Sequence, residues 1–338
     1  MKWLLVPDQR KINAYNQISE KTGMSAFAVE KDWWVVQALT CIFAMEDSKH
    51  IVFKGGTSLS KAWSLIERFS EDVDLAIDRT YLGFDGELSK NQRTELRKKA
   101  SSYISREFKL KLEQNFIERG FEGLTFKLVE SVDTDQDPRI IEIYYPNLIQ
   151  KPEYLDARVQ IEIGCRSLKE PFTERPISSL IDIHYPEHEF ISPSIFVPSV
   201  NPERTFLEKI FLLHEEFHRP VEKIRVKRLS RHIYDIYHLT KSGFADIAIN
   251  DKELYETIVS HRYKFTRIGG LNYNEHNPQT VNPIPIPEVI EEWKEDYKIM
   301  VEQMIYEENK PSFEDLIQNL VYLRSKLQNV DWSFELAF

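Results

Sequence analysis

Residues 52–78, VFKGGTSLSKAWSLIERFSEDVDLAID, decide the fold. The window opens with an apolar run that ends in a glycine pair, and it closes with EDVDLAI, which alternates with the period of two typical of a strand. Between them, Leu59, Trp63 and Ile66 have the i, i+4, i+7 spacing of a helix. The window therefore predicts a strand, a glycine turn, a connecting helix and a second strand.

Two aspartates on the second strand point to metal chemistry. Asp72 and Asp74 are separated by one residue, so a strand projects both to the same face. Adjacent carboxylates repel each other unless a cation lies between them, and Mg²⁺ prefers such hard oxygen ligands together with water and phosphate. The Gly55–Gly56 pair lets backbone N–H groups approach a phosphate, and Thr57 or Ser58 adds a hydroxyl donor. A phosphate cradle beside a metal-binding pair is typical of nucleotidyl transfer.

Other readings of the same residues fit less well. KGGTS has the wrong glycine–lysine order for a Walker loop and lacks its four-residue spacer. A calcium loop starting at Asp72 would need glycine at its sixth position and glutamate at its twelfth, where Ile77 and Gly83 stand. Two aspartates spaced in this way most often lie on a solvated strand edge. Here the nearby glycine pair and hydroxyl residues instead favour a functional site.

Composition limits the class of protein. The 338 residues suggest about two domains, and 44 Lys and Arg against 54 Asp and Glu give a net charge of −10, which argues against a protein that coats nucleic acid non-specifically. The two cysteines cannot build a disulfide framework or a Cys-based zinc site. Since neither a signal-peptide core nor a bilayer-length apolar run is present, we expect a soluble, cytoplasmic protein that does not contact membranes.

The remaining periodicity predicts two domains of different character. Strand patterns recur at FEGLTFKLVES, RIIEIYY and DARVQIEIGC, after a helical stretch over residues 88–119. Residues 180–199 are irregular and contain prolines, and helical patterns dominate after them. We expect an α/β (α+β) core with a mixed sheet over residues 1–198 and an α-helical domain over residues 199–338.

These motifs resemble the AbiEii/AbiGii toxin family of minimal nucleotidyltransferases, within the polymerase-β-like nucleotidyltransferase superfamily. Its pattern of KGG(T/S)xL, RxS and DxDL is matched by residues 54–59, 68–70 and 72–75. The family's EKDxx helix resembles residues 30–34, and its two C-terminal motifs resemble Glu208–Lys209–Ile210 and the helix of residues 231–237. The family often has an aspartate directly after the arginine of the last motif, where this sequence has His232.

The resemblance implies a polymerase-β-type core and roles for matching residues. It makes Asp72, Asp74, Lys209 and Asp235 the candidate catalytic residues, with Lys209 and Asp235 reaching the cleft from the C-terminal domain. The candidate nucleotide-binding residues are Lys54, Gly55, Gly56, Thr57, Ser58, Arg68, Ser70 and Arg231. The implied cofactor is Mg²⁺, or Mn²⁺ in its place, with an NTP as substrate.

Glu162, Lys209 and the pair Arg231–Asp235 also have ordinary structural interpretations. In the superfamily a third carboxylate from a neighbouring strand completes the metal site, and Glu162 in VQIEIG is the candidate, unless it only lies on a solvated strand face. Lys209 is at the edge of its helix's apolar stripe, where boundary lysines often extend to solvent. Arg231 and Asp235 are i, i+4 neighbours, which alone would be a surface ion pair; in the family's pattern Asp235 becomes a candidate general base or metal-orienting group.

The acceptor is inferred from charge and from the resemblance. Residues 219–231 carry six Arg or Lys against one acid and could position an RNA backbone, with residues 93–111 as a weaker second patch. The resemblance implies an RNA acceptor, a tRNA 3′ end, in a bacterial toxin–antitoxin or phage-defence (abortive infection) system with a cognate antitoxin. The alternatives are a protein or small-molecule acceptor such as an aminoglycoside, and a nonenzymatic nucleotide-binding scaffold.

Overall fold

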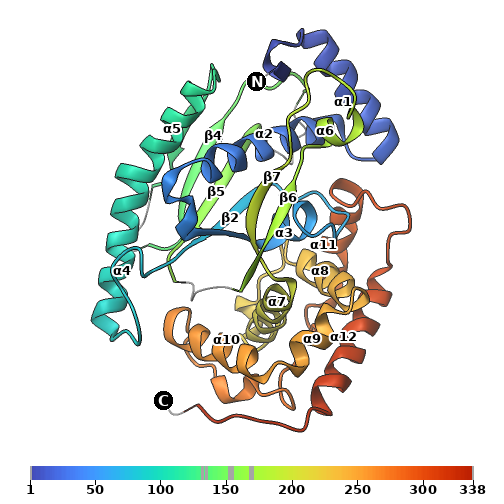
Figure 1. Ribbon diagram of the computed structural model, residues 1–338. Helices are drawn as coiled ribbons and strands as arrows, with labels where there is room; N and C mark the ends of the chain where they lie inside the picture. Colours follow the sequence, from blue (N-terminus) through green and yellow to red (C-terminus); the bar gives the residue numbers. More distant parts are fainter. Residues whose placement is uncertain (1, 131–132, 134–135, 151–155, 167–170, 337–338) are drawn as a thin grey trace. The chain divides into compact units, whose positions relative to one another are not determined.

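The chain folds into two compact units. The structure is a computed structural model that describes residues 2–130, 133, 136–150, 156–166 and 171–336 (Figure 1). The first unit comprises Met1–Ser64 and Phe69–Val200, and the second comprises Leu65–Arg68 and Asn201–Phe338. The chain thus enters the second unit twice, first for a four-residue segment that the sequence did not predict and again after Val200.

A mixed sheet organises the first unit. Its seven strands are β1 (Ile51–Lys54), β2 (Asp72–Ile77), β3 (Thr125–Leu128), β4 (Arg139–Tyr144), β5 (Arg158–Gly164), β6 (Phe172–Ile177) and β7 (Ile195–Val200). They are ordered β3-β4-β5-β2-β1-β7-β6. The β2–β5 and β1–β7 pairs are parallel and the other pairs are antiparallel. The predicted α/β class with a mixed sheet is confirmed.

Alternation along the central strands separates a buried face from a half-exposed one. On β2, Val73 and Leu75 are fully buried, whereas Asp72 and Asp74 are half-buried. The flanking strands β4 and β5 follow the same alternation, with isoleucine and valine on the buried side. The other face of this part of the sheet therefore carries its polar side chains together.

Helices cover the buried face and the ends of the sheet. They are η1 (Lys2–Leu5), α1 (Asp8–Thr22), α2 (Ala26–Phe43), η2 (Glu46–His50), α3 (Gly55–Lys61), α4 (Lys90–Tyr103), the π-helical η3 (Ile104–Phe108), α5 (Lys109–Glu118) and α6 (Leu180–His184). Helix α2 packs on β2 and β5, and it begins where the Ser25 side chain accepts a hydrogen bond from the Ala28 N–H (Figure 1). It also carries buried charge, since Lys31 pairs with Glu71 beside the start of β2.

The second unit is helical. Its helices are α7 (Pro202–Phe217), η4 (Val221–Lys223), α8 (Ser230–Lys241), α9 (Phe244–Asn250), α10 (Lys252–Phe265), η5 (Tyr273–His276), α11 (Ile290–Gln303) and α12 (Phe313–Gln328). Helix α7 begins with proline at its first position and packs against α8, α9 and α10, while α8 also contacts α11 and α12. Residue 68 joins this unit through an isolated β-bridge to Ile305.

Two local predictions were wrong. The connecting helix, expected to include Leu59, Trp63 and Ile66, ends at Lys61. Ser64 takes a left-handed conformation (φ 52°), and the residues after it up to β2 are not helical. Residues 180–199, expected to be irregular, contain α6 and strand β7. Pro198 argued against a strand because proline lacks the N–H that a ladder needs, yet it lies within β7 opposite Glu174.

Among the helices that the structure describes, none combines the length and the apolar character needed to cross a membrane.

Candidate active site

Gly55 fits its position because an aspartate lies directly against it. Strand β1 ends at Lys54, whose backbone is opposite Asp74 on β2. Gly55 then adopts φ +77°, and a Cβ atom built on it would lie 2.0 Å from Oδ2 of Asp74. Any side chain would therefore both strain the backbone and displace the Asp74 carboxylate. The KGG and DxD motifs therefore lie in direct steric contact within the first unit.

Asp72 and Asp74 project to the same half-exposed face of the sheet, as their spacing predicted. Both belong to the central strand β2, and the residue between them is fully buried on the opposite face. Strands on both sides fix the position of β2, so its carboxylates are held by a rigid scaffold. This arrangement provides two neighbouring oxygen donors on one surface.

Glu162 lies in the row of side chains that contains Asp74. The parallel register of β2 and β5 places Glu162 opposite Asp74 and Gln160 opposite Asp72. Nε2 of Gln160 donates to Oε1 of Glu162 over 2.8 Å. Sequence reasoning did not single out Gln160, although its period-two spacing from Glu162 was the available signal. Among the described residues, no group of three or more His, Cys, Asp or Glu side chains is arranged to hold a metal ion.

The hydroxyl groups of the glycine turn are less available than expected. Thr57 is buried and its hydroxyl donates to the backbone carbonyl of Asp72, with the Ser70 hydroxyl 2.9 Å away. Thr57 therefore ties α3 to the start of β2 through the same hydroxyl that was predicted to donate to a phosphate. Ser58 is also buried, and its Oγ has no hydrogen-bond partner in the described part of the chain. Ser70 is half-buried.

The second unit contains a buried cluster of opposite charges. Nε and Nη2 of Arg68 donate to Oδ1 and Oδ2 of Asp235 over 2.7 and 2.8 Å. Nζ of Lys209, from α7, lies 2.9 Å from Oδ2 of the same aspartate on α8. Only 1% of Arg68, 7% of Lys209 and none of Asp235 is exposed. A single carboxylate thus holds two cations from distant parts of the sequence.

These contacts determine the protonation of the cluster. Burial alone would raise the pKa of Asp235, but Arg68 and Lys209 hold it well below its usual range. Burial lowers the pKa of Lys209, and Asp235 opposes that shift. A carboxylate with so low a pKa and both oxygens engaged is a poor proton acceptor. The contacts of Asp235 are those of a group that positions Arg68 and Lys209, and they do not favour the predicted role of general base.

His232, the departure from the family pattern, belongs to the same cluster. Its Nδ1 lies 3.3 Å from Nζ of Lys209. Burial, followed by the charge of Lys209, lowers its pKa well below the usual value, so the imidazole is neutral near pH 7. A neutral Nδ1 can accept a hydrogen bond from the Lys209 ammonium. Arg231, one residue earlier on α8, is half-buried.

The basic segment of residues 219–231 is partly neutralised within its own unit. Arg219 and Arg225 both lie within ion-pair distance of Glu216, a buried residue near the end of α7. Lys223 and Lys227 are exposed, and no described residue forms an ion pair with them. The positive surface available to a partner is therefore centred on these two lysines and on the exposed side of Arg225.

The family of the chain follows from its sequence. The model of the family described as "Nucleotidyl transferase AbiEii toxin, Type IV TA system" matches residues 37–319. This chain belongs to the AbiEii family. Among solved structures, MenT4, nucleotidyltransferase toxin Rv2826c from Mycobacterium tuberculosis H37Rv, is 15% identical, covers 94% of this chain and 90% of its own, and has a TM-score of 0.49. JHP933 from Helicobacter pylori is 14% identical over 90% of this chain and 93% of its own, with a TM-score of 0.41. No curated protein sequence matches.

Membership of the AbiEii family makes the protein a nucleotidyltransferase toxin and confirms the resemblance inferred from the motifs. The description of the family as a type IV toxin–antitoxin system implies an NTP substrate and a cognate antitoxin. The matched range includes Gly55, Asp74, Lys209 and Asp235. Both groups of candidate residues thus lie in the part of this AbiEii-family chain that defines the family.

Proposed function

We propose that this toxin transfers a nucleoside monophosphate from an NTP to a hydroxyl at the 3′ end of tRNA and releases pyrophosphate. The observation that carries the proposal is the contact of Gly55 with Asp74, because it leaves a side-chain-free surface beside two carboxylates on one sheet face. A triphosphate needs both elements, a backbone that it can approach closely and oxygen ligands for its cations.

The metal site of the proposal uses Asp72 and Asp74, with Glu162 as a further ligand or a residue that orients one. Mg²⁺ is commonly bound by one or two carboxylates and completes its shell with water and substrate phosphates, which agrees with a sheet face that offers two carboxylates on one strand. When bound, Mg²⁺ or Mn²⁺ would neutralise charge on the triphosphate and favour attack on the α-phosphate. Lys54, in the row of Asp74, is assigned to the phosphates.

The cations of the second unit are assigned to the triphosphate as well. In this proposal Lys209, Arg68 and Arg231 neutralise the charge that develops on the pyrophosphate, and Asp235 keeps the first two in place. Ser70 contributes a hydroxyl donor. The exposed lysines of residues 219–231 would bind the tRNA backbone. The biological setting inferred is a toxin–antitoxin system that also serves phage defence.

The test is a labelling reaction with the purified chain. It is incubated with each α-³²P-labelled NTP, Mg²⁺ and total bacterial tRNA, beside the Asp72→Ala/Asp74→Ala double variant. Label in tRNA with the wild type only, and its loss when periodate has destroyed the 3′ diol, is the expected result. Label in the protein, or in an aminoglycoside supplied in a parallel reaction, would move the acceptor to another class. No transfer to any acceptor, with NTP binding intact by calorimetry, would replace the enzyme with a binding scaffold.

A further inference from the structure

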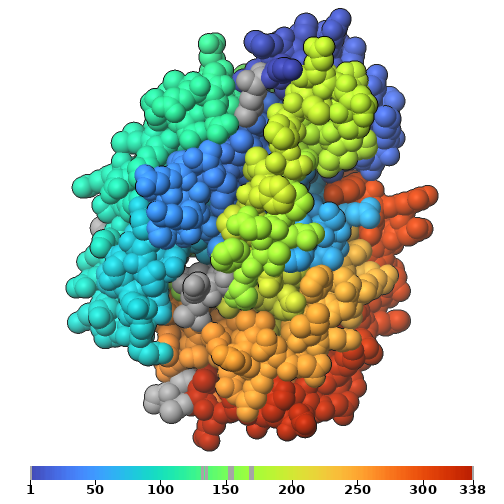
Figure 2. All heavy atoms as spheres, viewed as in Figure 1, coloured from blue at the N-terminus to red at the C-terminus, as the bar shows by residue number. Residues whose placement is uncertain are grey.

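A pocket in the first unit lies apart from the strands that carry Asp72 and Asp74. It has a volume of about 510 Å³ and is lined by η1, the first part of α1 and the turn of residues 185–190 that follows α6. Ligand pockets commonly span roughly 300–1,000 Å³. In Figure 2 the dark blue N-terminal residues and the yellow-green residues of this turn adjoin at the surface, and α1 and α6 also contact each other.

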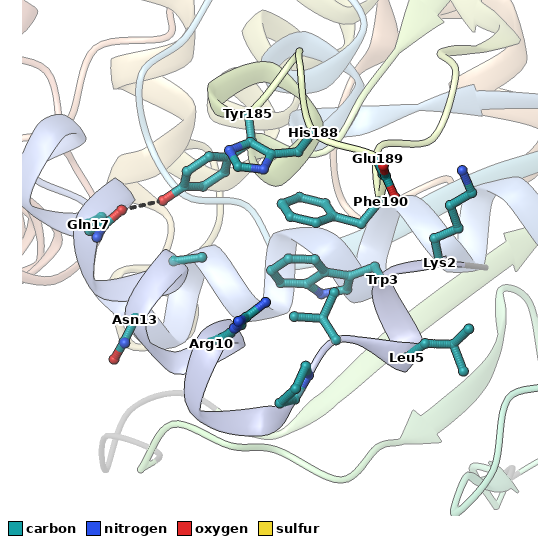
Figure 3. Close-up of a pocket in the computed structure, with 13 residues that line it drawn as sticks. Lys2, Trp3, Leu5, Arg10, Asn13, Gln17, Tyr185, His188, Glu189 and Phe190 are labelled. Carbon is teal, nitrogen blue, oxygen red and sulfur yellow. Dashed lines mark hydrogen bonds between the residues drawn. The ribbon is translucent and has the colours of Figure 1, made fainter.

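Aromatic rings form one wall of the pocket (Figure 3). The ring of Phe190 stacks on that of His188 at 5.0 Å and 13°, and it meets Trp3 edge to face at 4.7 Å. Trp3 is held in place by the protein interior: its indole N–H donates to the Tyr15 hydroxyl, and only 2% of the residue is exposed. His188 is exposed. The wall is therefore held rigidly at its base and ends in an accessible ring, which suits stacking by a planar group.

Two cations stand beside this wall. Figure 3 shows Lys2 and Arg10 on either side of Trp3. Both are exposed, and no described residue forms an ion pair with either. Their neighbour Lys11 differs, since it lies near Asp8 and donates to the backbone carbonyl of Leu4. The lining also includes one acid, Glu189, so the two cations leave the pocket with one net positive charge. In a chain of net charge −10, such a locally positive pocket favours an anionic ligand.

An amide of fixed orientation lies at the far end of the ring wall. The Tyr185 hydroxyl donates to Oε1 of Gln17 over 2.7 Å, which leaves Nε2 of Gln17 as a donor (Figure 3). Asn13, one turn earlier on α1, lines the same pocket. Side-chain amides can both donate to and accept from the edge of a heteroaromatic ring. The pocket thus combines stacking surface, positive charge and amide groups.

We propose that this pocket binds a nucleoside phosphate, with its base against His188 and Phe190 and its phosphate at Arg10 and Lys2. Purines and pyrimidines present a flat π-face and polar edges, and the phosphate carries the negative charge that the two cations favour. The group is either a free mononucleotide or a nucleotide of an RNA strand. The proposal does not depend on catalysis at Asp72 and Asp74, since no residue of the pocket lies on β1, α3 or β2.

The experiment measures binding without the proposed catalytic metal. The full chain with Asp72→Ala/Asp74→Ala is titrated in EDTA with AMP, GMP, CMP and UMP by calorimetry, and separately with a single-stranded RNA pentamer. His188→Ala and Arg10→Gln are added singly to this background. Lys21→Gln is the matched control, because it removes one exposed positive charge from the same helix outside the pocket. Arg10, Lys21 and His188 are exposed, and circular dichroism verifies that the variants fold.

The expected result is binding of a mononucleotide that weakens at least about tenfold in His188→Ala and Arg10→Gln and is unchanged in Lys21→Gln. Binding of the pentamer alone, with the same dependence on His188 and Arg10, would also support the pocket and identify RNA as the source of the nucleotide. Failure of both probes to bind, or binding that ignores both pocket variants, would overturn the proposal. None of these outcomes depends on transfer activity, so the proposed function is tested separately.

Discussion

Arg68 and Asp235 form a bidentate ion pair, with Nε–Oδ1 and Nη2–Oδ2 distances of 2.7 and 2.8 Å, although 167 residues separate them in the sequence. Both side chains are almost completely buried. The pair places the RxS motif of residues 68–70 and the C-terminal motif of residues 231–237 in one cluster. Two motifs that are far apart in the sequence are therefore linked by one buried ion pair.

Asp235→Asn should destabilise the protein strongly. The amide cannot neutralise Arg68 and Lys209, and breaking a buried pair by removing one partner costs about 3–5 kcal/mol. Denaturant unfolding measures the change in the free energy of unfolding. Asp246→Asn is the matched control, because Asp246 pairs with Lys326 at the surface of the same unit and should contribute less than about 1 kcal/mol. If Asp235→Asn abolished transfer while stability stayed unchanged, a direct proton-transfer role would replace the positioning role.

Gly55→Ala should abolish transfer, whereas Gly86→Ala should not. Both glycines have positive φ angles, so alanine strains both backbones by about 1–2 kcal/mol. Only at Gly55 would the new Cβ meet a neighbour, Oδ2 of Asp74 at 2.0 Å; at Gly86 no atom lies within 4 Å. The two variants thus separate backbone strain from displacement of the carboxylate. Transfer rates measured at a temperature where both variants are folded make the comparison, and equal losses of activity would refute the steric role of Gly55.

The local features of the site could be predicted from the sequence. The apolar run before the glycine pair predicted β1, and strand patterns predicted β2 to β5. The one-residue spacing placed Asp72 and Asp74 on one face. Glu162 was found because it is an isolated acid within an apolar alternating run, and the parallel register then placed it opposite Asp74. These predictions succeed because strand periodicity is a local property of the chain.

The features that the sequence did not reveal depend on contacts between distant residues. The side chain of Thr57 suits a phosphate, and only the packing of α3 against β2 reveals that its hydroxyl is already used. The spacing of Arg231 and Asp235 alone predicted a surface ion pair, whereas Asp235 is fully buried and its carboxylate pairs with Arg68 and Lys209. Residues 65–68 continued a helical pattern and instead joined the second unit. Tertiary contacts override local propensity at all three places.

Stability should fall as the pH is lowered from 7 to 5. Burial, with the nearby His276 and His218, lowers the pKa of His214 from 6.5 to about 2. Below pH 6.5 the unfolded chain therefore binds a proton at this residue that the folded chain does not, and the folded state loses about 2 kcal/mol between pH 7 and 5 from His214 alone. Unfolding free energies across this range measure the slope. His214→Gln keeps an acceptor for the Asn282 N–H and should flatten the slope; an unchanged slope would exclude His214 as its source.

The exposed lysines of residues 219–231 should set the salt dependence of tRNA binding. Lys223→Gln/Lys227→Gln should weaken binding and reduce the slope of log K against log salt by about 1.5–2, because each lysine releases about one counterion from a phosphate. The matched control is Lys294→Gln/Lys298→Gln, which removes two exposed lysines of the same unit that lie near Glu314 and Glu295. Filter binding between low and physiological salt gives both slopes. An equal reduction in the control pair would mean that overall charge, rather than this segment, binds the RNA.

Glu162→Gln should raise the Mg²⁺ concentration required for half-maximal transfer. Glu162 shares a row with Asp74, and the amide would keep its size while removing the negative charge that favours a divalent cation. Glu142→Gln provides the comparison, because Glu142 lies on the same sheet face but pairs with Arg158 at 2.8 Å and accepts from the Tyr144 hydroxyl. Changes in metal-binding shells commonly alter affinity by about 10–100-fold. If the wild type and Glu162→Gln needed the same Mg²⁺ concentration for half-maximal transfer, Glu162 would not be a ligand, and the protein would bind the metal through Asp72 and Asp74.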